Sequence, residues 1–161
     1  MTTPIDIVNA ANNYIGQQIG SSANATWMMR NITHGRDGWR YFAELAVLDA
    51  ALFNQDSKLK YIIESAVAKG SAAGAIWNAL IAAGCICHQT KPSLGSIALF
   101  RYGKTGLAFM SVVGRCDNHI TFQSIEGDES GQYIAIERER SVSMPYNENG
   151  LNLVGFISIV A

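Results

Sequence analysis

The first half of the chain carries apolar residues at the three-to-four-residue spacing that is typical of helices. Such stripes occupy residues 5–19, 42–53, 59–67 and 71–84. Thr3 is suited to cap the first helix and Pro4 to stand in its first turn, while Ser57 and Gly70 are suited to open and close the third. Residues 26–35 show no clean period and are predicted to form a loop or irregular turn.

The second half of the chain changes to short segments rich in β-branched and aromatic residues, separated by Gly, Asn, Asp and Ser. These predicted strands are residues 96–102, 107–113, 119–125, 132–138 and 152–160. Helices followed by closely spaced strands predict an α+β fold, with N-terminal helices packed on a C-terminal antiparallel sheet. Because either half alone would have a thin core, residues 1–161 are expected to form a single domain.

Composition excludes several classes of partner. The chain is 48% hydrophobic and 16% charged, with a net charge of -1 and a pI of about 6.3. No basic field is present that would hold nucleic acid or an anionic membrane, so neither is expected as a partner. The N-terminus lacks the pattern of a signal peptide, and the most apolar segment, 72–87, is too short to span a bilayer. We therefore expect the chain to remain in the cytosol in which it is made.

The three cysteines suggest neither disulfides nor a metal site. Cys85, Cys87 and Cys116 are an odd number without a signal peptide. The sequence CICH at 85–88 does not have the usual C-x₂₋₄-C spacing, and the other histidines, at 34 and 119, are distant in sequence. The segment is interpreted instead as a helix exit with one thiol packed and one facing solvent, and no metal or cofactor is expected.

One segment of the helical half carries a resemblance to a known family. Residues 38–46, GWRYFAELA, resemble the G-W-P-Y-C-A-x-F-V segment that begins the nucleophile helix of CHAP-type amidases and endopeptidases. These are papain-like cell-wall hydrolases common in phages and bacteria. Three further segments resemble family motifs in the same order, namely 94–101 (P-G-D-I-V-L-F-R), 124–129 (T-I-E-G-N-T) and 155–157 (G-F-I), and residues 106–110, GLAFM, occupy the place of the G-H-V-G-I-V strand that carries the family's histidine.

The resemblance implies a papain-like fold and a specific, degenerate site. Phe42 stands in the position of the family's catalytic cysteine, and Leu107 or Ala108 stands in the position of its histidine. Glu126 and Asp128 match the orienting acid and its polar partner, and the family's sheet would bring them near Phe42. From the residues alone, Glu126 and Asp128 are equally well interpreted as turn residues at a strand end.

The chemistry of these positions argues against catalysis. Papain-like hydrolysis needs a thiolate and an imidazole, and Phe42 with Leu107 or Ala108 supplies neither. Two replacements are weakly supported: Ser71, which is better explained as a helix cap, and the pair Cys116 and His119, which flanks a predicted hairpin turn. We therefore expect no catalytic residues, and Phe42 is expected to close the former site by packing.

Three functions remain open at this point. The first is a non-catalytic papain-like protein of a phage particle, in the tail, baseplate or capsid-associated, with virion subunits as protein partners and a groove that still binds glycan or peptide. Such a protein would be assembled into the virion in the host cytoplasm. The second is an active peptidoglycan amidase or endopeptidase with a displaced catalytic set, and the third is a cytosolic protein-binding regulator. Trp27, Met28 and Met29 are candidates either for a protein interface or for the core.

Overall fold

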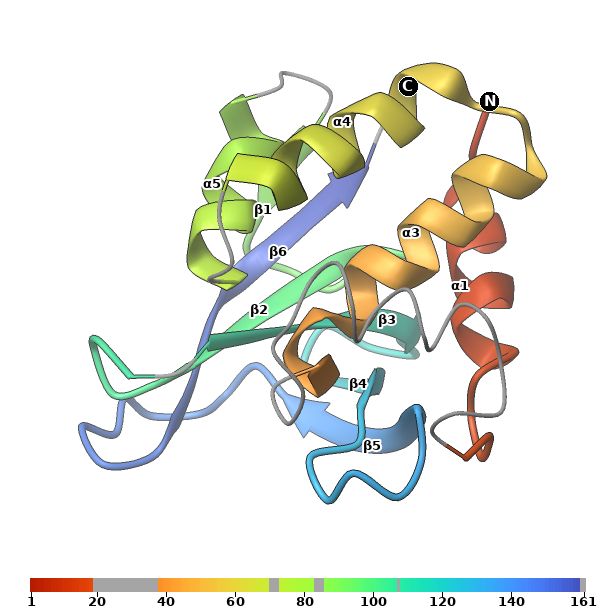
Figure 1. The fold of residues 1–161 in the computed structure, drawn as a ribbon. Helices are drawn as coiled ribbons and strands as arrows, with labels where there is room; N and C mark the ends of the chain where they lie inside the picture. The colour runs from red at the N-terminus through yellow and green to blue at the C-terminus, as the bar shows by residue number, and fades with distance from the viewer. Residues whose placement is uncertain (19–37, 70–72, 83–85, 107, 160–161) are drawn as a thin grey trace.

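The computed structural model describes residues 1–18, 38–69, 73–82, 86–106 and 108–159. Its helical elements are α1 (Pro4–Asn12), the 3₁₀ helix η2 (Gly38–Tyr41), α3 (Phe42–Phe53), α4 (Ser57–Lys69) and α5 (Ala73–Ala82). Its strands are β1 (Ile86–Gln89), β2 (Ile97–Tyr102), β3 (Ala108–Arg115), β4 (Thr121–Gly127), β5 (Ala135–Ser141) and β6 (Leu151–Ile159). The α+β fold with N-terminal helices and a C-terminal antiparallel sheet is thus confirmed (Figure 1).

Helix α1 begins where its sequence signals predict. Thr3 caps α1 in a capping box: its side chain accepts a hydrogen bond from the backbone of Asp6, whose carboxylate in turn accepts one from the backbone of Thr3. However, α1 ends at Asn12, earlier than the predicted stripe, and Ile15 instead pairs with Ala135 at the start of β5. The second predicted helix, α3, has the predicted bounds, whereas Ile19 and residues 26–35 lie outside the described residues.

The sheet has the strand order β1-β6-β2-β3-β4-β5, and every neighbouring pair is antiparallel. Strand β1 was not predicted: the interpretation of residues 85–88 as a helix exit is wrong for 86–88, because Cys87 pairs with Ser158 of β6. Strand β4 begins two positions after its prediction, since the Asn118 side chain accepts hydrogen bonds from the backbones of Ile120 and Thr121 and holds a turn there.

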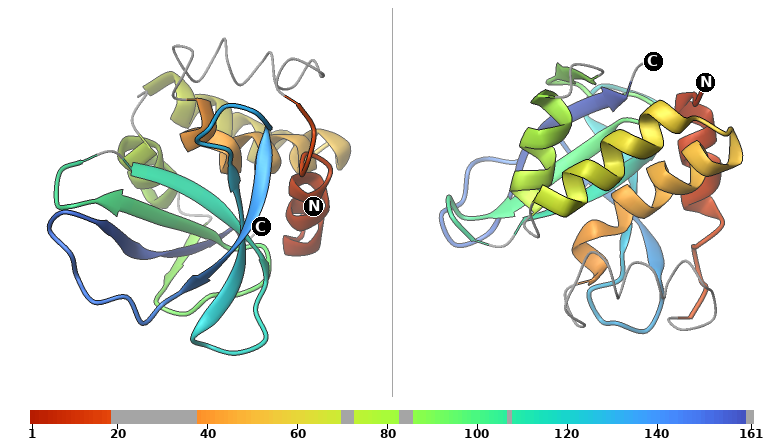
Figure 2. Two further views of the ribbon diagram at one scale, coloured as in Figure 1. Left: turned by 90° about the horizontal axis from the view of Figure 1, so that it is seen from below. Right: turned by 45° about the horizontal axis from the view of Figure 1, so that its top comes forward.

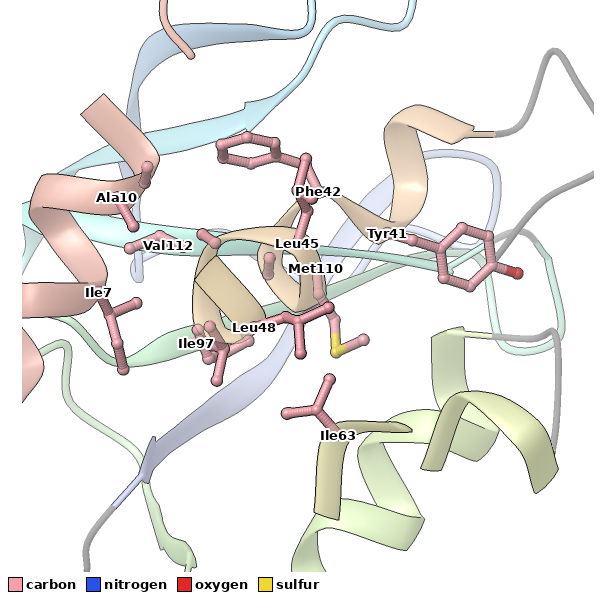
Figure 3. Close-up of a cluster of buried hydrophobic side chains, with 14 of the residues drawn as sticks. Ile7, Ala10, Tyr41, Phe42, Leu45, Leu48, Ile63, Ile97, Met110 and Val112 are labelled. Atoms are coloured by element: carbon pink, nitrogen blue, oxygen red, sulfur yellow. The ribbon is translucent and has the colours of Figure 1, made fainter. Parts of the chain in front are cut away.

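The face of the sheet that the helices cover holds the larger core. Helix α3 lies between the sheet, α1 and α4 (Figures 1 and 2), and nine of its twelve residues are buried. Alternate residues of β3, namely Ala108, Met110 and Val112, share one apolar cluster with Phe42 and Leu45 of α3 (Figure 3). An apolar helix of this kind is stable only when neighbours surround it, so α3 is the centre of the fold.

Among the described residues, the opposite face of the sheet is covered by no α-helix, although Trp39 of η2 packs against its cluster. Its cluster is aromatic and includes Phe100, Phe109, Phe122 and Phe156. In a flat sheet, β4 and β6 would lie about 14 Å apart, three strand spacings. The ring centroids of Phe122 on β4 and Phe156 on β6 are nevertheless only 5.3 Å apart. The sheet therefore curls strongly on itself and buries this face within the curl (Figure 2).

Candidate degenerate active site

The start of α3 is the position at which the resemblance places a nucleophile. Helix η2 runs directly into α3, whose N-cap residue Tyr41 offers no side-chain cap. Phe42 is 0% exposed, and its ring meets that of Tyr14 edge to face with centroids 6.0 Å apart. The side chain at this position is therefore buried in the apolar cluster and contacts an aromatic ring.

The first residue of β3 lies in the same cluster. Ala108 is 7% exposed and belongs to the same large apolar cluster as Phe42. Ala108 has no group that accepts a proton. Leu107, the other candidate for the lost histidine, lies outside the described residues.

The end of β4 lies directly against η2. A Cβ atom added to Gly127 would stand 2.0 Å from the backbone oxygen of Trp39, which no larger residue allows. This contact places the segment 126–128 beside the turn that leads into Phe42, so the sheet does bring these distant parts of the chain together.

The Glu126 carboxylate, however, lies on the face of the sheet opposite to Phe42. Its neighbour Ile125 occupies the helix-facing position, and side chains alternate along a strand. Arg140 of β5 donates to both Glu126 oxygens, at 2.7 and 3.0 Å, and Ser124 donates at 2.8 Å. Glu126 was expected near Phe42: the end of β4 does lie beside the turn before Phe42, but the Glu126 carboxylate points to the other face, where Arg140 pairs with it.

This ion pair belongs to a buried polar network within the curled sheet. The hydroxyl of Ser111 lies 2.7 Å from that of Ser124, and Glu126 is 3% exposed. The Arg140 guanidinium lies 5.3 Å from the ring centroid of Phe100, a cation–π distance. Hydrogen bonding to Glu126 also raises the pKa of Arg140. Both carboxylate oxygens of Glu126 are therefore bonded to neighbouring side chains of the sheet.

Asp128 organises the turn that follows β4. Its two oxygens accept hydrogen bonds from the backbones of Ser130, at 3.0 Å, and Tyr133, at 2.9 Å. Burial alone would raise the pKa of Asp128, but the hydrogen bonds from Tyr133 and Ser130 together outweigh it and lower the pKa. These contacts are those of a turn-forming aspartate, in agreement with the turn interpretation of this residue.

Sequence reasoning did not single out Glu44, two positions after Phe42. Glu44 is 2% exposed, and neither of its carboxyl oxygens has a hydrogen-bond partner among the residues that the structure describes. Burial raises the pKa of this carboxyl well above its ordinary value. A signal was present in the sequence: an acid within a stripe that is apolar on every side must be buried with the helix.

The remaining candidates that the structure describes do not form a site. Cys116 and His119 lie in the turn between β3 and β4 and not at a helix start, while Ser71 and Cys85 lie outside the described residues. In the described part of the chain, no group of three His, Cys, Asp or Glu side chains is placed to hold a metal ion. Within the same residues, no helix is long and apolar enough to cross a membrane.

The geometry therefore shows a helix start closed by an aromatic ring, beside a strand end whose acid is paired elsewhere. Comparison of the chain with protein families, curated proteins and solved structures finds no match.

Proposed function

We propose that this protein is a non-catalytic, papain-like protein that serves as a structural or binding subunit of a phage particle. One observation carries the proposal: Phe42, at the place where the resemblance puts a catalytic thiol, is fully buried in an apolar cluster. A hydrolase needs a reactive atom that a substrate can reach, and this position offers neither reactivity nor access.

The other two catalytic roles lack candidates at the same place. Ala108 cannot act as a general base, and the acid Glu126 lies on the other face, held by Arg140. Loss of cooperating catalytic groups removes the covalent route as a whole, because each group depends on the others. The family relation itself rests on the order of the five segments and on the contact of η2 with the end of β4. The orientation of Glu126 departs from what that relation implies.

The role in a particle rests on the resemblance and on the surface. CHAP-type domains are common in phages, and a domain without chemistry retains its surfaces as its means of acting. Large apolar side chains are exposed at several places, among them Phe53 (85%), Tyr61 (72%) and Ile120 (56%). Exposed aromatic and aliphatic groups of this kind are suited to protein interfaces.

The test combines an activity assay with a fractionation. Purified protein is incubated with peptidoglycan and with a mixture of peptides between pH 5 and pH 9, beside an active CHAP-type amidase. We expect no cleavage by the wild type, by Phe42→Cys or by Phe42→Cys combined with Ala108→His. In lysates of the organism that encodes the chain, we expect the protein to sediment with phage particles.

Two results would overturn the proposal. One is turnover that survives replacement of all three cysteines by serine and is lost in Ser71→Ala, which would identify a serine hydrolase. The other is a protein that stays in the soluble fraction when particles are pelleted, which would favour a cytosolic role.

A further inference from the structure

Strand β5 forms one edge of the sheet, at the opposite end of the strand order from β1 (Figure 1). It pairs with β4 from Ala135 to Ser141, and of the described elements only β4 makes extensive contact with it. On its other side, the backbone N–H of Gly16 donates to the carbonyl oxygen of Ala135, at 3.3 Å. The segment after α1 therefore already pairs with the first residue of this edge.

The direction of that hydrogen bond shows which backbone groups of β5 point outward. In an antiparallel pair, the N–H and C=O of one residue point to the same side, and successive residues alternate. Because the carbonyl of Ala135 points away from β4, the backbone groups of Glu137, Glu139 and Ser141 point the same way. No described residue bonds to these three sets of groups, and the residues at 137 and 139 are exposed. The edge beyond Ala135 is therefore open to a further strand.

The acidic residues of β5 share one face of the sheet. Glu137 and Glu139 alternate with Arg138 along the strand, so both carboxylates lie on the side opposite to its guanidinium. Arg115, a cation on the same face as the glutamates, is paired with Asp117 at 2.8 Å and feels the charge of Glu137 more weakly. The glutamates therefore leave this side of the edge with a net negative charge.

The other side of the edge is basic. Arg140 donates to both oxygens of Glu126, and the Nε atom of Arg138 lies 3.8 Å from one of the same oxygens. One acid thus faces two guanidinium groups, and these three side chains keep a net positive charge. Arg138 is the accessible cation of this set, with 54% of its side chain exposed.

We propose that the β5 edge binds an extended segment of another protein, in which basic and acidic residues alternate, as an added antiparallel strand. Every pair in this sheet is antiparallel, and residues directly opposite each other in such a pair share a face. The cations of the added strand lie opposite Glu137 and Glu139, and its acid lies opposite Arg138. This surface is separate from the start of α3, so the proposal does not rest on the papain-like relation.

A second copy of β5 is a poor partner for this edge. Antiparallel pairing of two identical strands through their outward-pointing groups would set Glu137 and Glu139 against the glutamates of the copy, and Arg138 against its arginines. Like charges directly opposite each other destabilise a strand pair. The charge order of β5 therefore opposes self-association and favours a strand of the complementary order.

The first test compares two fluorescent eight-residue peptides of the same composition. In one, Lys and Glu alternate between terminal Val residues, and in the other the Lys residues form a block that precedes the Glu residues. We expect saturable binding of the alternating peptide, weakened by salt, and binding at least about fivefold weaker for the block peptide. Amide chemical shifts of the ¹⁵N-labelled protein should change at residues 137–141 and not in α4.

Methylation of the peptide backbone tests the strand geometry. A residue opposite Glu137 or Glu139 directs its own N–H toward β5, because the two residues exchange hydrogen bonds. N-methylation of the Lys residues in the alternating peptide should therefore abolish binding, whereas N-methylation of its Glu residues should leave the affinity within about threefold. The two methylated peptides carry the same charges, so their difference reports the hydrogen bonds.

Protein variants identify the edge. Glu137→Lys combined with Glu139→Lys should weaken binding of the alternating peptide at least about tenfold. The matched control, Glu64→Lys combined with Glu148→Lys, makes the same change of net charge at exposed positions outside β5 and should leave binding within about twofold of wild type. Urea melts establish that each variant is folded.

Four results would overturn the proposal. Two are the absence of saturable binding of the alternating peptide up to about 1 mM, and equal binding of the block peptide. The third is binding that N-methylation of the Lys residues leaves unchanged. The fourth is self-association in sedimentation equilibrium that the Glu137→Lys and Glu139→Lys variant abolishes, which would make the occupant a second copy. Peptide binding is measured without bond cleavage and without phage particles, so its failure and the failure of the proposed function are distinguishable.

Discussion

The start of α3 and the end of β4 touch, yet they accommodate polar groups in different ways. At the start of α3, the position that the resemblance assigns to a nucleophile is occupied by the ring of Phe42, which needs no hydrogen bond. At the end of β4, the acid Glu126 is paired with Arg140 on the far face of the sheet. The fold thus buries a ring by packing and a carboxylate by pairing, and the following substitutions separate these two kinds of burial.

The largest effect is expected at Phe42. Removing a buried aromatic ring leaves a cavity, so Phe42→Ala should lower the free energy of unfolding by about 3–5 kcal/mol in urea melts. Phe42→Leu, which keeps most of the volume, should cost less than half as much. A Phe42→Ala protein within about 0.5 kcal/mol of wild type would mean that the ring does not fill a closed site.

The second largest effect on stability is expected for the ion pair between Glu126 and Arg140. Glu126→Leu should lower the free energy of unfolding by about 3 kcal/mol, because it leaves the Arg140 charge partly buried without its partner. The double variant Glu126→Leu with Arg140→Met removes both charges and should recover most of that loss. If the double variant is no more stable than the single one, the pair is not the reason for the loss.

At Glu44, a substitution is expected to increase the stability of the protein. Glu44→Leu removes a buried carboxyl that has no partner in the described structure, and should raise the free energy of unfolding at pH 7 by about 1–3 kcal/mol. The wild type should also lose stability as pH rises above the unfolded pKa of a glutamate, since the folded state binds the proton more tightly. Glu44→Gln should lack this part of the pH dependence. A wild type and a Glu44→Gln protein with parallel pH profiles from pH 4 to pH 8 would argue against a buried acid.

The smallest effect is expected at Asp128. Asp128→Ala should lower the free energy of unfolding by about 1 kcal/mol, because the turn at 128–133 loses its side-chain acceptor. The folded pKa of Asp128 is lowered, so its contribution is present above the unfolded pKa of an aspartate and disappears as pH falls through the folded pKa. A difference from wild type that persists at pH 2 would show that the carboxylate charge is not involved.

The features that could be predicted best from the sequence are those that depend on residues close together along the chain. The bounds of α3 followed from a strong apolar stripe, and the cap of α1 followed from Thr3 and Pro4. Strand β1 was missed because four residues carry little periodic signal and its strand form depends on pairing with the distant β6.

The candidate site was predicted only in part, because it too depends on strand pairing between distant parts of the chain. The burial of Phe42 follows from local pattern, but the partner of Glu126 depends on the register between β4 and β5, which pairs Phe122 with Arg140. The alternation of Phe122, Ser124 and Glu126 with Ile125 already indicated that the acid faces away from the helices. This alternation by itself predicts that the Glu126 side chain points away from Phe42, contrary to what the family motif implies.

The place of β6 between β1 and β2 has a consequence for how the protein is made. During translation, β1 and β2 leave the ribosome long before β6, and neither can pair with the other, because β6 must enter between them. Until then the nascent chain exposes two unpaired strand edges, the kind of surface on which chains aggregate. We therefore expect a chain truncated before β6 to be insoluble, and the full chain to depend on chaperones while that strand is still in the exit tunnel.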